Sequence, residues 1–133
     1  MAPILGIWAS QNYSRYSITG SYESIATVTV GSGGSSYIEF TSIPATYSHL
    51  QIRIISASVF GTTVVDILDY ANTNKYKTFR SLMGIDNNGS GSIRLRSGLW
   101  MSTSAITAIK MTPSTSGSFQ QYSSFALYGI ASA

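Results

Sequence analysis

Short segments in which apolar and polar residues alternate run along most of this chain, separated by residues that favour turns. A period of two residues is typical of a β-strand with one buried face, whereas a helix would show a period of about 3.6 residues. The clearest turn is at residues 86–91 (DNNGSG), because Asn, Asp and Gly tolerate a left-handed backbone. We predict strands over residues 22–30, 37–41, 49–57, 63–70, 76–83, 93–101, 106–112 and 122–130.

This succession of short strands predicts an all-β fold, an antiparallel β-sandwich of jelly-roll type with about eight strands. The first two segments, which the glycine-rich residues 31–34 connect, are expected to pair as a β-hairpin. A short helix is an alternative for residues 63–70, because nothing there breaks one. Residues 1–20 do not alternate, and we expect them to form an extended N-terminal arm that precedes one sandwich domain over residues 21–133.

Charged residues make up 10% of the chain, against about 25% in an average soluble domain. A monomer with so few charges would have a sparsely charged surface, and coverage by other subunits would account for this. Nucleic-acid binders usually gather more Lys and Arg on one face than the 8 in this chain provide. There is no cysteine, and no apolar run approaches the ~18 residues of a membrane span. We expect no nucleic-acid partner and no membrane insertion.

Few side chains could carry catalysis. A nucleophile–base relay would need His49, the single imidazole, which is expected at the edge of a loop. Glycoside hydrolysis needs two carboxylates that face each other across a cleft. The five candidates are Glu23, Glu39, Asp66, Asp69 and Asp86. Asp66 and Asp69 would point to opposite faces of a strand, and residues 86–91 lack the spacing of an EF-hand calcium loop. We expect no enzymatic activity, no cofactor and no metal site.

Two sets of cations could form basic stripes on strand faces. The first set is Arg53, Arg94 and Arg96, and the second is Lys75, Lys77 and Arg80. Either stripe could meet a phosphate or an acidic partner, although such residues are more often the solvated faces of their strands. Exposed tyrosine and tryptophan rings could also stack on sugars.

Residues 63–70 and 122–130 are apolar on both strand faces. In a sheet with one solvated face, the second face should be polar, so here it needs cover. A neighbouring subunit or the chain's own loops could supply that cover, and the low charge favours the subunit. We expect a subunit interface at Val65, Ile67, Phe125 and Leu127.

Five segments, in order, resemble a family of small virion structural proteins of marine and freshwater tailed phages. They are residues 22–37 (YESIATVTVGSGGSSY), 41–53 (TSIPATYSHLQIR), 65–77 (VDILDYANTNKYK), 97–103 (SGLWMST) and 121–130 (QYSSFALYGI). The start, residues 3–7 (PILGI), resembles a leader that several phage virion proteins share. Relatives carry a longer segment where residues 55–63 join two strands directly, so a variable and possible receptor-binding region is shortened here.

The resemblance implies a virion component that is assembled in the host cytoplasm and is not an enzyme. The favoured role is a homotrimeric capsid decoration (cement) protein, which binds the major capsid protein through its N-terminal arm. Its anchors would be Ile4, Leu5, Ile7 and Trp8, because apolar and tryptophan side chains are prominent in interfaces. The alternative is a tail-fibre or tailspike-type tip that is bound to a tail protein and contacts polysaccharides on the host surface.

Overall fold

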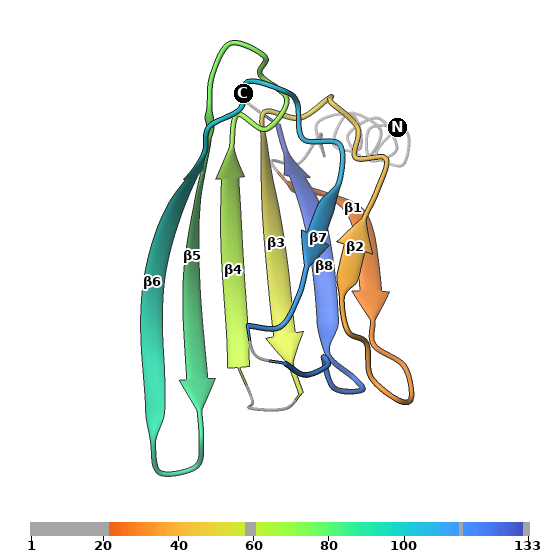
Figure 1. Cartoon of the computed structure of the whole chain (residues 1–133), viewed down its shortest axis with the longest axis vertical. Helices are drawn as coiled ribbons and strands as arrows, with labels where there is room; N and C mark the ends of the chain where they lie inside the picture. Colours follow the sequence, from red (N-terminus) through yellow and green to blue (C-terminus); the bar gives the residue numbers. More distant parts are fainter. Residues whose placement is uncertain (1–21, 58–60, 115, 132–133) are drawn as a thin grey trace, which may run out of the picture.

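Eight β-strands form the regular structure of the chain in this computed structural model, which describes residues 22–57, 61–114 and 116–131 (Figure 1). They are β1 (Tyr22–Thr29), β2 (Ile38–Phe40), β3 (His49–Ser56), β4 (Gly61–Leu68), β5 (Lys77–Asp86), β6 (Gly91–Trp100), β7 (Ile109–Met111) and β8 (Ser124–Ile130). Six strands form an antiparallel sheet in the order β1-β8-β3-β4-β5-β6, and β2 and β7 form a second, two-stranded sheet. The predicted arm, residues 1–20, lies outside the described residues.

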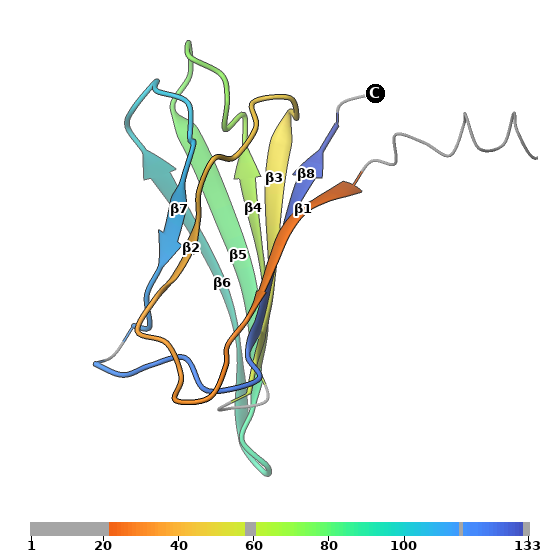
Figure 2. The same ribbon diagram turned by 90° about the vertical axis from the view of Figure 1, so that its right-hand side faces the viewer.

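The two sheets pack as layers, with the small sheet on one face of the large one (Figure 2). We call that covered side of the large sheet the inner face and the opposite side the outer face. Alternate residues of β3, Leu50 and Ile52, meet Phe40 of the small sheet in one buried core. The core consists of Val30, Ile38, Phe40, Ile43, Leu50, Ile52, Ile67, Tyr70, Phe125 and Leu127. The predicted all-β antiparallel sandwich is confirmed.

The strand order follows a jelly roll in one half of the molecule. β1 pairs with β8 and β2 with β7, as when a chain folds back on itself as one long hairpin. β3 and β6 do not pair, because β3, β4, β5 and β6 instead continue as an antiparallel meander. The turn predicted at residues 86–91 joins β5 to β6, with a left-handed backbone at Asn88 (φ 53°) and Gly89 (φ 105°).

The expected hairpin of the first two strands is wrong. β1 and β2 lie in different sheets, and the glycine-rich segment carries the chain from one layer to the other. Gly34 has a positive φ of 77°, and a Cβ there would meet the carbonyl oxygen of Phe119 at 2.7 Å. The neighbouring Ser35 forms an isolated bridge with Phe119. Residues 31–34 are therefore specialised for a crossing between sheets.

The helix considered for residues 63–70 is also excluded, because β4 pairs along both of its edges, with β3 and with β5. The predicted subunit interface is wrong for three of its four residues. Ile67, Phe125 and Leu127 are buried in the chain's own core beneath the small sheet, so a second subunit cannot reach them. Val65 is half-buried on the same inner face.

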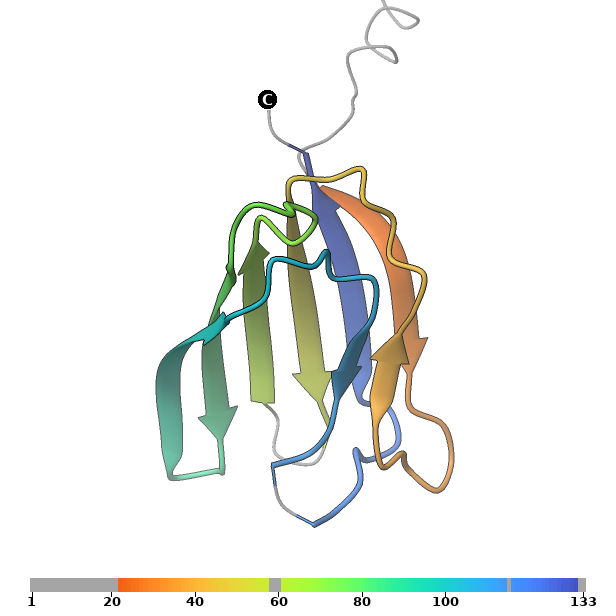
Figure 3. The same cartoon turned by 45° about the horizontal axis from the view of Figure 1, so that its top comes forward.

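The small sheet is too narrow to cover the large one. Figures 1 and 3 both show β2 and β7 over the β1–β8–β3 half, which leaves the inner face of β5 and β6 open. Phe79 of β5 is accordingly 41% exposed and Trp100 of β6 is 45% exposed. Two surfaces of the large sheet therefore lack cover within the described residues: its outer face, and its inner face beyond β7.

Candidate functional site

The outer face carries an exposed apolar patch on β4, β5 and β6. Leu82 lies opposite Leu95 in the sheet, and Ile93 lies opposite Gly84, so these side chains adjoin on one face. Ile93 is 83% exposed and Leu95 is 74% exposed. We define the outer patch as Leu68, Leu82, Ile93, Leu95 and Leu99, all of which are exposed. No element of the described chain lies over it (Figure 2).

A row of hydrogen-bonded polar side chains crosses the outer face between members of the outer patch. Arg53 Nε donates to Gln51 Oε1 at 2.8 Å, and Gln51 Nε2 donates to Asp66 Oδ1 at 2.8 Å. Arg80 Nε donates to the second oxygen, Asp66 Oδ2, at 3.3 Å. The Arg53 guanidinium also lies 5.0 Å from the centre of the Tyr128 ring. The row spans β8, β3, β4 and β5, and Arg80 lies between Leu82 and the pair Leu68 and Leu99, so the row divides the outer patch into two parts.

The two predicted basic stripes do not form. Arg53 is on the outer face of β3, whereas Arg94 and Arg96 alternate with the outer-patch residues of β6 and so lie on the inner side. The second set also separates. Lys75 lies in an exposed turn, Lys77 is buried on the inner face, and Arg80 is on the outer face. An extended anion site on these residues is therefore excluded.

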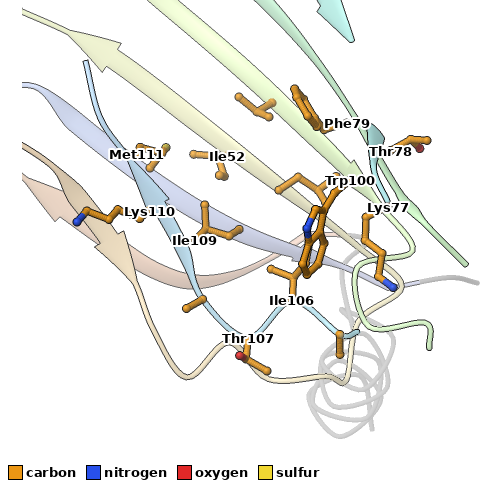
Figure 4. A pocket seen from close by; sticks show the side chains of 14 residues that line it. Ile52, Lys77, Thr78, Phe79, Trp100, Ile106, Thr107, Ile109, Lys110 and Met111 are labelled. Carbon is orange, nitrogen blue, oxygen red and sulfur yellow. The ribbon is translucent and has the colours of Figure 1, made fainter. Parts of the chain in front are cut away.

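An apolar groove of about 640 Å3 runs between the large sheet and the segment that leads into β7 (Figure 4). Its floor includes Val65, and one wall carries Phe79 and Trp100 of the uncovered strands. The other wall carries Ile106 and Ile109. We call this hollow the β7 groove. Its lining holds no carboxylate and no imidazole, and its two charged residues are lysines.

Lys77 fixes the wall of the β7 groove, and sequence reasoning missed this role. Its side chain is 1% exposed, and its ammonium donates to three main-chain carbonyls. The acceptors are Asn72 and Lys75 in the β4–β5 connection and Thr103 in the β6–β7 connection, the last at 2.9 Å. The ammonium thus ties together two connections that are distant in sequence. A lysine in an alternating strand gives no sign of this, because the acceptors are main-chain atoms.

Tyr70 performs a similar function nearby. Its hydroxyl donates to the carbonyl oxygen of Pro44 and accepts from the N–H of Tyr47 at 3.3 Å, while its own carbonyl accepts from Ile106 N–H at 2.9 Å. Burial raises the pKa of Tyr70 above its usual value, so the hydroxyl stays protonated and keeps donating. The pKa of Tyr47 is also raised, chiefly by burial and secondly by the Glu23 carboxylate.

His49 lies at the first residue of β3, at the loop edge that the sequence predicts. Its Nδ1 accepts a hydrogen bond from the main-chain N–H of Asp69 at 3.0 Å, and Asp69 Oδ1 is 4.0 Å away. Asp69 lies past the end of β4, in a left-handed conformation (φ 52°), and pairs with Lys75 at 3.4 Å. The imidazole is therefore held as part of a turn.

The carboxylates are spread over the described structure. Glu23 is on β1, Glu39 on β2, Asp66 on the outer face and Asp86 at the β5–β6 turn, where it accepts from Asn88 N–H at 2.9 Å. In the described ranges, no three His, Asp or Glu side chains approach closely enough to hold a metal ion. Every buried side-chain nitrogen and oxygen in this part of the chain has a hydrogen-bond partner.

The predicted anchors Ile4, Leu5, Ile7 and Trp8 lie outside the described residues, so their role stays a prediction. No helix in the described part of the chain is both long and apolar enough to cross a membrane. The surfaces that the structure offers for association are thus the outer patch and the β7 groove. No family model matches the chain, and no curated protein or solved structure is significantly similar to it.

Proposed function

We propose that this chain is a non-enzymatic structural protein of a phage virion, which assembles as a homotrimer and decorates the capsid. The observation that carries the proposal is the outer patch, because gathered exposed apolar side chains often mark an interaction site, whereas single scattered ones are ordinary. The resemblance of five sequence segments to tailed-phage virion proteins supplies the setting.

The outer patch is suited to contact between copies of the chain. Leu82, Ile93 and Leu95 are 53%, 83% and 74% exposed and adjoin on β5 and β6, and an exposed apolar group of this kind often marks an interaction site. Three outer faces turned toward one three-fold axis would bury their apolar side chains against one another. The polar row crosses this surface, so Arg80 and Asp66 would lie within the contact as a hydrogen-bonded pair.

Quantitative mass spectrometry of purified particles tests the proposed location, with the major capsid protein as the internal standard. A decoration protein is expected at a copy number comparable with that of the major capsid protein. A copy number comparable with that of the tail proteins would support the tail-tip alternative instead. Absence of the chain from purified particles would contradict both roles.

A further inference from the structure

The β7 groove lacks an occupant within the described chain, although its chemistry is that of a protein interior. It is apolar, and the exposed rings of Phe79 and Trp100 form one side (Figure 4). A second hollow of about 510 Å3 continues along β7 and shares Val65 and Met111 with the first. The two together make a channel that follows β7 and the segments on either side of it.

The edge of β7 faces this channel. Within the described residues β7 pairs only with β2, so the main-chain groups along its other edge have no strand partner. A two-stranded sheet is marginal by itself, and a third strand would stabilise it. Extended peptides bind such edges by adding a strand, with alternate side chains inserted into neighbouring pockets.

The chain itself contains a segment of matching chemistry. Residues 3–9 (PILGIWA) are free of charge and place Leu5 and Ile7, or Ile4 and Trp8, on one side of an extended strand. We propose that residues 3–9 lie in the β7 groove of their own chain and pair with β7 as the third strand of the small sheet.

The length of the preceding chain permits this. β1 begins at Tyr22, which lies opposite Ile130 of β8, and Ile130 in turn lies opposite His49 at the start of β3. Lys77 at the start of β5 and Trp100 at the end of β6 lie at this same end of the sheet. From β1 to the β4–β5 region the segment must cross three to four strand spacings, roughly 15–20 Å. Residues 10–21 reach up to about 40 Å when extended. Attachment to the same chain also gives the segment a high effective concentration, which favours its own groove over that of another copy.

This placement does not depend on the proposed virion function. It differs from the predicted shell-anchoring role of the arm, because it directs the same apolar residues into the body of the protein. If the groove is filled in this way, the surface left for contact between copies is the outer patch.

Crosslinking of the full chain tests the placement, and the natural absence of cysteine makes single pairs unambiguous. Ile7→Cys is combined with Thr107→Cys in the groove wall, or with Thr27→Cys on the outer face of β1 as the control. Both threonines are exposed, and Thr27 is the closer to residue 7 in sequence. In dilute protein with a short bismaleimide, the groove pair is expected to crosslink within one chain on the order of tenfold faster than the control. Equal rates, or products that join two chains, would overturn the proposal.

Tryptophan fluorescence gives a second readout. Trp8→Phe leaves Trp100 as the single tryptophan, which the docked segment should shield from acrylamide. Adding Leu5→Asp and Ile7→Asp to this variant should expel the segment, shift the Trp100 emission to the red and raise quenching several-fold. Ser10→Asp with Ser17→Asp adds the same charges to the linking part of the arm and should leave the emission unchanged. Trp100 emission that is identical in all three variants would contradict the docking.

Discussion

Replacing Lys77 with methionine is expected to lower the free energy of unfolding by about 3–5 kcal/mol. Methionine keeps an apolar stem but lacks the ammonium that donates to the main-chain carbonyls of Asn72, Lys75 and Thr103. Because Lys77 is 1% exposed, water has little access to replace that donor. Urea denaturation, followed by tryptophan fluorescence, measures the loss.

Lys75→Met is the matched control, since it removes the same charge two residues earlier. The Lys75 side chain is 62% exposed and pairs with Asp69 Oδ2 at 3.4 Å. An exposed ion pair of this kind contributes below about 1 kcal/mol. Losses of equal size in Lys75→Met and Lys77→Met would show that the buried ammonium does not stabilise the two connections.

The second large effect is expected for Gly129→Ala, which should cost about 2–3 kcal/mol. Gly129 is a buried residue of β8, and a Cβ there would overlap the ring of Tyr47. The overlap reaches Tyr47 Cγ, at the base of the ring, so the backbone would have to move, and the hydrogen bond from Tyr47 N–H to the buried Tyr70 hydroxyl holds that backbone. The free energy of unfolding from urea denaturation again provides the measurement.

Gly98→Ala separates steric overlap from the general effect of a glycine in a strand. A Cβ at Gly98 would overlap the ring of Phe79 in a similar way. The overlap involves Cζ and Cε1, at the far end of a ring that is 41% exposed, so a small rotation of the ring relieves it. We expect a change within about 1 kcal/mol, since alanine also lowers the entropy of the unfolded chain. A larger loss for Gly98→Ala than for Gly129→Ala would be inconsistent with the packing described.

Alternation was sufficient to predict the strands themselves. Each of the eight segments overlaps a strand, and β3 and the turn at residues 86–91 agree with their predicted bounds to within one or two residues. Alternation reports which side chains share a face, and it does so because successive side chains of a strand point in opposite directions. Ile93 and Leu95 therefore share one face of β6, and Arg94 and Arg96 the other, as their spacing indicates.

Pairing and coverage could not be obtained in the same way, because both depend on contacts between distant segments. The sequence of β1 does not reveal that its partner is β8 instead of β2. The face on which the small sheet packs decides that Phe125 and Leu127 are covered by their own chain while the outer patch is not. The uncovered apolar surface is therefore the outer patch, and not the set Val65, Ile67, Phe125 and Leu127 that the sequence indicated.

The central claim is that the outer patch joins copies of the chain, and sedimentation equilibrium of the purified full-length protein tests it most directly. We predict a species of about 43 kDa, three times the 14.3 kDa of one chain. Leu82→Asp with Leu95→Asp should convert it to 14.3 kDa monomers, because the charges would be buried in the contact. Ser36→Asp with Thr41→Asp, at exposed positions near β2, should leave the trimer intact. Wild-type protein that sediments as a 14.3 kDa monomer at tens of micromolar would contradict the account.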